Sequence, residues 1–374
     1  MGGGTRTPES SRPISETGGA AGRDKTTEMV EPVTSFNSPG QANTNARMYP
    51  TLEKLGLLKR DHIRIKDLGH VEQVLTSIVT EGYSKLQLVV DFDFTLTKVH
   101  VDGQRCHCSW ACVWTCSLLV FQVIADFDRT LTRVWYNGKK CETCYGIMDN
   151  SPMMPDFYRE EANQLLARYY PIELDPHMTE AEKIPHMMEW YRNIHALILK
   201  CHVNKSSFKG MVSDSNIRLR DGTEELFGSL HRAGVPVLVL SAGIGDVLVE
   251  VLQHFNVYTD NVKVVANFFK YNKEGVIEGF QGDAIHMFNK NENAIHSSDY
   301  FQRLEGRANV ILMGDSLGDV KMAVGVPNPV NVLKIGFLND KIEERLESFM
   351  NNFDLVLIDD QTMDVAKTVL DQLK

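Results

Sequence analysis

The sequence predicts an α/β fold in which a doubly wound parallel sheet forms the core and a mainly helical cap is inserted after the first catalytic strand. Two patterns predict it. Short apolar runs typical of buried strands alternate along the chain with segments of helical periodicity, as in parallel sheets covered by helices on both faces. One long stretch, residues 155–219, departs from this alternation because it has helical patterns and no strand-like run.

The first 47 residues are rich in glycine, serine, threonine, proline and asparagine and carry almost no bulky apolar side chains. Such a segment buries too little surface to offset the entropy of ordering it, so we predict a disordered tail over residues 1–47. The tail also has no apolar segment of the kind that marks a secretory signal peptide. We therefore expect a cytoplasmic protein.

The charge and the apolar content of the chain limit the classes of partner that it can bind. A formal net charge of −10 argues against binding a nucleic-acid polymer through a basic surface. Residues 106–125 carry no charged side chain and approach the length of a membrane-spanning helix. The run contains polar residues, however, and ends in a predicted catalytic strand, so we expect no membrane span. We expect a monomer.

The folded part begins after residue 47, with apolar residues at helical spacing over residues 71–79. Strand-like runs follow at residues 86–90, 123–125, 235–240, 262–265, 310–313 and 355–358. Helical patterns lie between most of these runs, at residues 224–233, 245–255, 319–324, 341–350 and 363–373. Parallel strands bring their carboxyl ends to one edge of the sheet, where doubly wound folds bind their ligands.

The helical stretch contains its own start signal. Residues 155–170 show helical periodicity, and Thr179 and Glu182 have the spacing of a capping box that opens a further helix. A helical insertion after a catalytic strand is typical of a cap that excludes water and selects the substrate. We predict a cap over residues 136–219 and a core over residues 48–135 and 220–374.

The most specific chemical signal is a repeated motif. Residues 91–97 read DFDFTLT and residues 126–132 read DFDRTLT, each copy after an apolar run. A strand that ends in Asp-x-Asp-x-Thr can hold a nucleophilic carboxylate, a second carboxylate for proton transfer and a cation site. The motif therefore predicts a catalytic site at a strand end.

Two further strand ends carry polar groups. The run at residues 235–240 leads into Ser241, Ala242 and a glycine-rich turn, which suits a phosphate oxygen or an ordinary helix cap. The run at residues 310–313 leads into Asp315 and Asp319, which could hold Mg²⁺ or form a solvated loop. Lys290 is by itself one surface charge among many. The order of these segments along the chain favours the functional alternatives.

In that order, the Asp-x-Asp-x-Thr motif, Ser241, Lys290 and the Gly-Asp-x-x-x-Asp segment resemble the haloacid dehalogenase superfamily of phosphatases. The resemblance implies a Rossmann-like core, Mg²⁺ as cofactor and an aspartyl-phosphate intermediate. It implies that Asp126 is the nucleophile and Asp128 the general acid and base. It assigns the phosphoryl group to Thr130, Ser241, Ala242 and Lys290, and the metal to Asp126, Asp128, Asp315 and Asp319.

Several short motifs narrow the resemblance. Residues 136–144, 169–173, 241–246 and 333–340 are similar to the cytosolic 5′-nucleotidase III family, which implies hydrolysis of CMP, UMP and 7-methyl-GMP. Glu173 falls where the family has a glutamate that contacts the base. Trp190 could stack on the base or belong to the core. At Ile194 some relatives carry a serine that contacts the nucleotide, so the preferred base stays open.

The chain has two copies of the motif, but the predicted fold has only one position for it. A doubly wound sheet has one first catalytic strand, so only one copy can face Ser241 and Asp315. We assign it to the copy with Asp126, because its connection to the cap is uninterrupted, and keep Asp91 and Asp93 as the duplicate candidates. Residues 91–125 are then an extra segment, looped out or packed elsewhere. Two alternative exons joined by read-through intron sequence would produce it, since residues 116–122 match a pyrimidine-rich stretch ending in TTT-CAG.

Other functions stay open at this point. The aspartyl-phosphate could pass to a nucleoside instead of water, which would make the enzyme a nucleoside phosphotransferase. The duplicated segment could also displace a strand and leave an inactive isoform. The cysteines at residues 106–116, and Cys141 with Cys144, do not match the common paired zinc-binding arrangements, so we expect no zinc site.

Overall fold

The computed structural model describes residues 48–81, 86–88, 100–101, 104–105, 123–175, 177–290, 309–325 and 329–372. All of these residues belong to one compact unit, residues 33–374. The predicted tail, residues 1–47, lies outside the described residues, and so do most of residues 91–122.

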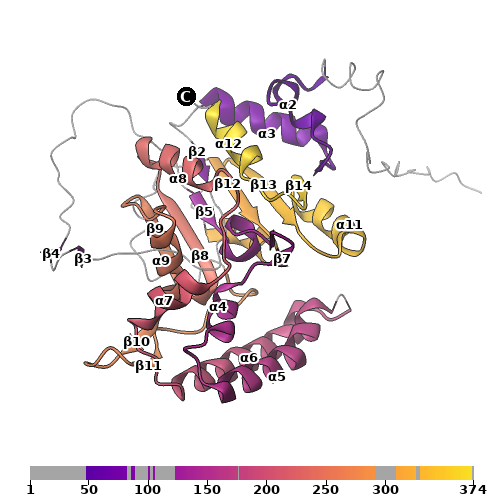
Figure 1. The fold of residues 1–374 in the computed structure, drawn as a ribbon. Coiled ribbons are helices and arrows are strands. Elements are labelled where there is room, and N and C mark those ends of the chain that lie inside the picture. Colours follow the sequence, from indigo (N-terminus) through magenta and orange to yellow (C-terminus); the bar gives the residue numbers. More distant parts are fainter. Residues whose placement is uncertain are drawn as a thin grey trace, which may run out of the picture. The chain divides into compact units, whose positions relative to one another are not determined.

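A mostly parallel sheet forms the centre of the described fold (Figure 1). One ladder has the order β1 (Ile63–Arg64), β14 (Leu355–Ile358), β13 (Asn331–Leu338), β12 (Asn309–Gly314) and β2 (Leu86–Leu88). The other has the order β5 (Val123–Ala125), β8 (Val237–Ile244) and β9 (Val262–Asn267). Every pairing is parallel except that of the short edge strand β1 with β14. A parallel sheet of this kind aligns the carboxyl ends of β5, β8 and β12.

An apolar core covers each face of the sheet. Along β12, Ile311 and Met313 join one cluster of buried side chains, whereas Val310 and Leu312 join the other. Residues of β8 and β14 alternate in the same way, because successive side chains of a strand point to opposite faces. Helices contribute to both clusters, so the predicted doubly wound fold is confirmed.

The helices that cover the sheet are amphipathic. In α12, for example, Val365, Ala366, Val369 and Leu370 are buried at helical spacing. The first apolar cluster receives α3 (Leu68–Glu81), α8 (Thr223–Arg232), α9 (Gly245–His254) and α12 (Asp364–Asp371). The second receives α11 (Ile342–Asn352) and the short 3₁₀ helix Asp319–Gly325. The short helix α2 (Pro50–Lys54) packs against α3.

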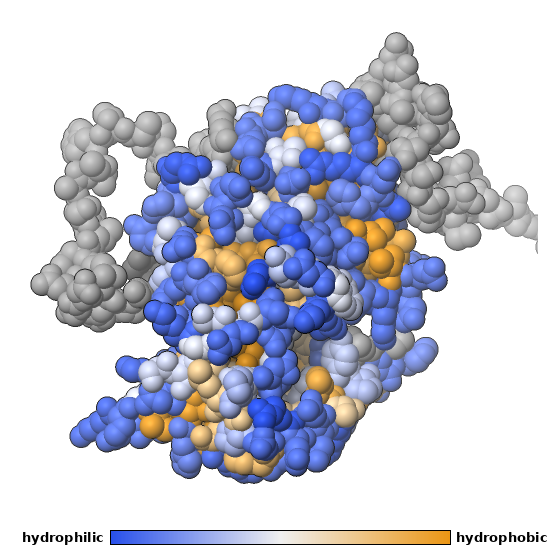
Figure 2. Space-filling view, viewed as in Figure 1, coloured by the Kyte–Doolittle hydropathy of each residue, from blue (hydrophilic) through white to orange (hydrophobic). Residues whose placement is uncertain are grey.

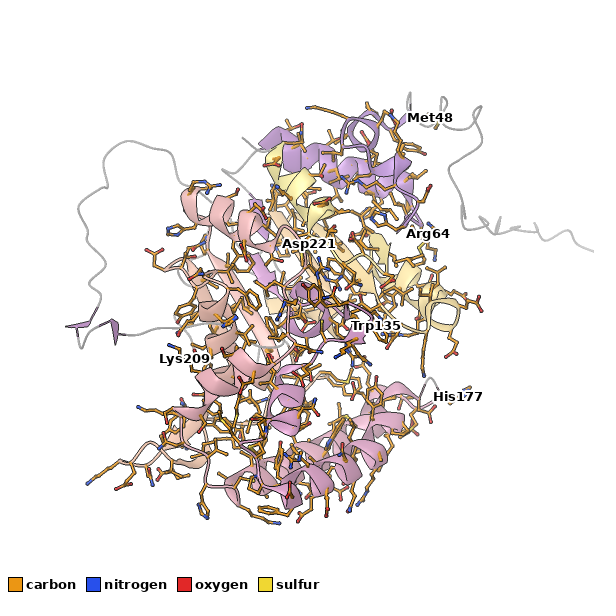
Figure 3. All side chains as sticks on the ribbon, in the orientation of Figure 1. Met48, Arg64, Trp135, His177, Lys209 and Asp221 are labelled. Atoms are coloured by element: carbon orange, nitrogen blue, oxygen red, sulfur yellow. The ribbon has the colours of Figure 1, made fainter. Side chains whose placement is uncertain are left out.

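A mainly helical segment follows β5. It contains α4 (Cys144–Asn150), α5 (Asp156–Leu174), α6 (Glu180–Leu199) and α7 (Ser207–Asp214). The predicted capping box is present, since Thr179 and Glu182 bond reciprocally at the start of α6. Helices α5 and α6 pack side by side, and Figure 3 labels His177 at the turn between them. The boundaries of the cap, residues 136–219, stay a prediction.

A short hairpin connects β5 to this segment. Its strands are β6 (Trp135–Tyr136) and β7 (Lys139–Lys140), and Figure 3 labels Trp135 on it. The turn uses Asn137 and Gly138, both with positive φ (50° and 72°), as a two-residue turn between twisted strands requires.

Several strands differ from the runs that the sequence predicted. Strand β13 has Lys334 and Gly336 in its interior, which interrupt the apolar run. The hairpin of β10 (Phe269–Tyr271) and β11 (Ile277–Phe280) is short and alternates irregularly. Strand β8 continues through Ser241 to Ile244, where the glycine-rich sequence predicted a turn. The sheet therefore extends further toward its carboxyl edge than the sequence indicated.

The segment before each copy of the motif forms a strand. Strand β2, which precedes the first copy, pairs with β12, and β5, which precedes the second, pairs with β8 and contacts β12. The strands before both motif copies therefore lie in the sheet, which corrects the expectation that only one of them would. The first copy of the motif, residues 91–97, lies outside the described residues.

Among the described residues, no helix is both long and apolar enough to cross a membrane. Figure 2 shows a face on which hydrophilic residues predominate and apolar residues form separate patches.

Candidate active site

The second copy of the motif leads directly from β5 into a tight loop. Asp126 has an extended backbone, and residues Phe127–Leu131 form a single wide helical turn. Arg129 adopts a left-handed conformation inside it, with φ of 74°. The turn buries the side chains of Asp126, Asp128 and Thr130 at the carboxyl end of β5.

Three carboxylates from two strand ends meet beside this turn. Asp126, Asp315 and Asp319 each place an oxygen so that these atoms lie within 4.8 Å of one another. Gly314, the last residue of β12, makes the approach possible, because a Cβ atom there would lie 2.6 Å from Oδ2 of Asp319. The predicted convergence of the β5 and β12 ends is therefore observed in the described residues.

Lys290 supplies a buried positive charge to the same group. Its Nζ lies 3.6 Å from Oδ1 of Asp126 and 3.6 Å from Oδ1 of Asp319, and the side chain is 5% exposed. Gly318 allows the loop after β12 to approach the segment that precedes Lys290, because a Cβ atom at position 318 would lie 2.5 Å from the carbonyl oxygen of Met287. A residue that looked like one surface lysine among many thus lies in the centre of the cluster.

The cluster is electrostatically suited to a divalent cation. Burial raises the pKa of Asp126, and Lys290 opposes that shift. Burial and the carboxylates of Asp126 and Asp319 raise the pKa of Asp315 well above its usual range. Oδ1 of Asp319 is buried without a hydrogen-bond partner. Buried carboxylates that repel one another offer hard oxygen ligands, which fit a cation such as Mg²⁺.

The Asp128 side chain has a different hydrogen-bond partner. Its two carboxylate oxygens accept hydrogen bonds from the backbone amide of Cys144, at 3.2 and 3.3 Å. Cys144 begins α4, so the carboxylate lies at the positive end of a helix. Of the predicted metal ligands, the structure brings Asp126, Asp315 and Asp319 together, and the Asp128 side chain is not in that group.

The predicted phosphate contacts have definite partners. The Thr130 hydroxyl donates to Oδ2 of Asp126 at 2.6 Å. The Ser241 hydroxyl accepts from the amide of Gly243 at 2.8 Å. Ala242 is buried next to it, and its carbonyl accepts from the Asn267 side chain at 2.5 Å. The phosphate contacts of Thr130, Ser241 and Ala242 stay predictions.

The two predicted base contacts lie on neighbouring helices. Glu173 is in the last turn of α5, where burial raises its pKa and the guanidinium of Arg129 opposes the shift. Its carbonyl accepts from Nζ of Lys183 on α6 at 2.9 Å. Trp190 on α6 stacks on Tyr169 of α5, with ring centroids 5.9 Å apart. That contact ties the two helices together, as expected of a packing residue.

Arg220 is a site residue that the sequence did not reveal. It is 1% exposed, and its Nε donates to the Thr130 carbonyl at 2.5 Å. Its Nη2 donates to the Arg129 carbonyl and, at 2.9 Å, to the side chain of Asn339. Burial lowers the pKa of Arg220 to about 10. These hydrogen bonds stabilise the motif turn. No periodicity or spacing in the sequence indicates this role for Arg220.

Other predicted residues lie elsewhere. Asp91 and Asp93 are outside the described residues, as are the cysteines at residues 106–116. Cys141 and Cys144 are buried free thiols. Among the described residues, the only grouping of at least three carboxylate, thiolate or imidazole ligands is the aspartate cluster.

Known proteins resemble the chain over most of its length. The family described as pyrimidine 5′-nucleotidase (UMPH-1) matches residues 129–374. A Homo sapiens protein named 7-methylguanosine phosphate-specific 5′-nucleotidase is 47% identical over 321 residues, which cover 86% of this chain and 95% of the relative. A Caenorhabditis elegans protein named putative cytosolic 5′-nucleotidase 3 is 34% identical, over 84% of this chain and 76% of its own.

A solved structure shares the fold. The crystal structure of cytosolic 5′-nucleotidase IIIB bound to cytidine superposes with a TM-score of 0.70 at 36% sequence identity, covering 86% of this chain and 97% of its own. The match of family, relatives and fold agrees with the strand-end aspartates described above. The chain therefore belongs to the UMPH-1 family of pyrimidine 5′-nucleotidases.

Proposed function

We propose that the chain is a Mg²⁺-dependent 5′-nucleotidase that hydrolyses CMP, UMP and/or 7-methyl-GMP to nucleoside and phosphate through an aspartyl-phosphate. The observation that carries the proposal is the Asp126 carboxylate at the end of β5, with Lys290 3.6 Å away and Asp315 and Asp319 beside it. An anionic nucleophile and an anionic substrate repel each other, so the reaction needs this concentration of charge.

Asp126 is the proposed nucleophile. One of its carboxylate oxygens attacks phosphorus, the bond from phosphorus to O5′ breaks, and Asp128 donates its proton to O5′ so that the nucleoside leaves. The separation of the two aspartates supports these roles. Thr130 and Lys290 hold Asp126 in the cluster, whereas Asp128 is held at the start of α4.

The second half-reaction returns the enzyme to its first state. Asp128 takes a proton from a water molecule, whose oxygen attacks phosphorus, and the bond from phosphorus to Asp126 breaks to release inorganic phosphate. Lys290 and the Ser241 hydroxyl would bind the phosphoryl oxygens. Asp126, Asp315 and Asp319 would hold the cation, which neutralises charge between carboxylate and phosphate.

We propose that Glu173 contacts the base of the nucleotide. A carboxylate accepts hydrogen bonds from exocyclic amines, which cytosine and guanine carry, and its charge attracts a cationic 7-methylguanine. The name of the human relative and the cytidine in the related crystal structure support these substrates. The name of the Caenorhabditis elegans relative supports a cytoplasmic location.

The test is phosphate release by the purified full chain from CMP, UMP and 7-methyl-GMP, with Mg²⁺ and after its removal by EDTA. Asp126→Asn protein purified in the same way controls for contaminating phosphatases. We expect turnover only with the unsubstituted chain and the metal. Lack of turnover with every monophosphate would overturn the proposal. Phosphate transfer to an added nucleoside in place of release would identify a phosphotransferase.

A further inference from the structure

Asn267 is a buried polar residue beside the proposed phosphate contacts. It is the last residue of β9, and it is 2% exposed. Burying an amide costs free energy unless its donors and its acceptor are hydrogen-bonded. The partners of Asn267 therefore indicate what the residue does in the fold.

The side-chain amide of Asn267 joins two segments that are distant in the sequence. Its Nδ2 donates to the carbonyl of Ala242 at 2.5 Å and to the carbonyl of Ile285 at 2.9 Å. Its Oδ1 accepts from the backbone amide of Ile285 at 2.8 Å. Exchanging the two amide atoms would place an oxygen against both carbonyls, so the hydrogen bonds fix their assignment. One side chain thus bonds to β8 and, twice, to the segment that leads to Lys290.

The first of these segments departs from the regular ladder of the sheet. The pairing of β8 with β9 shifts in register after Leu240, so that residues 241–243 of β8 lie opposite a single residue of β9. An irregularity of this kind takes backbone groups out of the ladder and redirects side chains. Asn267 supplies the hydrogen bond to the Ala242 carbonyl in this stretch. The backbone that presents Ser241 is therefore held from the neighbouring strand by a side chain.

The second segment ends at Lys290 and forms a turn. Asn289, the residue before Lys290, donates from its Nδ2 to the carbonyl of Ala284 at 2.9 Å, which closes the chain around Ile285. The two hydrogen bonds between Ile285 and Asn267 therefore fix this turn relative to β9. The position of Lys290 depends on the same side chain as the position of the β8 end.

We propose that Asn267 is a positioning residue that holds the Ser241 segment and the Lys290 segment at the separation that a phosphoryl group requires. The inference rests on the proposed function, in which Ser241 and Lys290 bind the phosphoryl oxygens. Asn267 acts through these two segments and takes no part in the transfer of the phosphoryl group itself.

The physical reason is that two groups bind one anion together only when the distance between them is fixed. Donors to a reacting oxygen lie at about 2.7–3.1 Å, so a shift of one segment by about 1 Å loses a contact and can lower the rate about 100-fold. A residue that only stabilised the fold would change the amount of folded protein. It would leave the affinity of the folded protein for phosphate unchanged.

The experiment compares Asn267→Leu, which has the same branched shape and loses all three hydrogen bonds, with Asn309→Leu as a matched control. Asn309 is 0% exposed, and its Oδ1 accepts from Nδ2 of Asn331 at 2.7 Å. It begins β12, at the end of the strand opposite to the aspartate cluster. Both variants should lose stability in thermal unfolding. Asn267→Ala, which is smaller, replaces the leucine variant if that protein does not fold.

We measure kcat for CMP and the inhibition constant of inorganic phosphate, both with Mg²⁺, and the affinity for cytidine by calorimetry. In Asn267→Leu, kcat should fall about 10- to 100-fold and the inhibition constant of phosphate should rise about tenfold. The affinity for cytidine should stay within about twofold, because the base side is unchanged. In Asn309→Leu all three quantities should stay within about twofold.

An unchanged inhibition constant of phosphate in Asn267→Leu would overturn the inference, even if stability and kcat fell. An equal rise in both asparagine variants, or an equal loss of cytidine affinity, would also overturn it, because either indicates general disruption. If the unsubstituted chain hydrolyses no nucleotide, the proposed function fails, and calorimetric titration with inorganic phosphate then tests the inference. Weaker binding in Asn267→Leu alone supports it, whereas equal or absent binding overturns it.

Discussion

The hydroxyl of Thr130 donates a 2.6 Å hydrogen bond to Oδ2 of Asp126, and both side chains are buried at the end of β5. The other carboxylate oxygen, Oδ1, lies 3.6 Å from Nζ of Lys290. Each oxygen of the proposed nucleophile thus has its own partner, and together they fix the rotation of the carboxylate. A fixed carboxylate can meet phosphorus without first reorganising.

Removing the Thr130 hydroxyl should slow the chemical step. Thr130→Val keeps the shape of the side chain and loses the donor, so we expect kcat to fall about 10- to 100-fold, the usual worth of a hydrogen bond to a charged group. Thr130→Ser retains the donor and should stay within about threefold of the unsubstituted chain. Steady-state kinetics check both. A raised KM with unchanged kcat would instead indicate that Thr130 only binds phosphate.

The two motif copies should differ in their contribution to activity. Asp126→Asn removes the nucleophile, and we expect kcat to fall by about 10³-fold or more. Asp91→Asn should leave kcat within about twofold, because the second copy supplies the aspartate to the cluster. Phosphate release from CMP by each variant measures this. The reverse outcome would assign catalysis to the first copy.

Loss of the Arg220 side chain should destabilise the fold. The Thr130 carbonyl accepts from Nε of Arg220, and Arg220→Met would leave it buried without this partner. We expect the free energy of unfolding to fall by about 2–4 kcal/mol, measured by urea denaturation. Arg220→Lys keeps a donor and a charge and should lose less. Equal stability of the methionine variant and the unsubstituted chain would contradict a structural role for this arginine.

Asp149 should make stability depend on pH. Burial raises its pKa from 3.8 to about 6, although a 2.7 Å hydrogen bond from the Tyr158 hydroxyl opposes the shift. The folded state therefore binds the proton more tightly than the unfolded state. The contribution of protonated Asp149 to the stability of the fold is fully present below about pH 4 and is lost as pH rises through 6.

Asp149→Asn tests this dependence because asparagine still accepts from Tyr158 and cannot ionise. At pH 7–8 the variant should be more stable than the unsubstituted chain by about 1–3 kcal/mol, and near pH 4 the two should be similar. Urea denaturation across this range isolates the group, since every other carboxylate is common to both proteins. A difference in stability that does not vary with pH would contradict the assignment.

The sequence predicted the parts of the site that follow from strand periodicity. Asp126 and Asp315 each come directly after an apolar run, and parallel strands end at one edge of a sheet. Their predicted proximity is therefore a consequence of the fold class. The capping box at Thr179 and Glu182 was equally predictable, because capping is decided within one turn of a helix.

Other features depend on contacts between distant segments. Lys290 and Arg220 enter the site from loops whose sequence has no periodicity, so their positions are decided by the packing of those loops. Trp190 could equally have faced a nucleotide or a helix, and its contact with Tyr169 required the geometry of two paired helices. The direction of Asp128 depends on the amide of Cys144, which belongs to a separate helix.

By itself the sequence determined the fold class, the family resemblance and the identity of the carboxylates, because these depend on periodicity and on short motifs. Among the described residues, the tertiary structure decided that Asp126, Asp315 and Asp319 meet and that Lys290 faces them. Charges interact across space and without regard to sequence separation, so only the folded chain reveals these pairs.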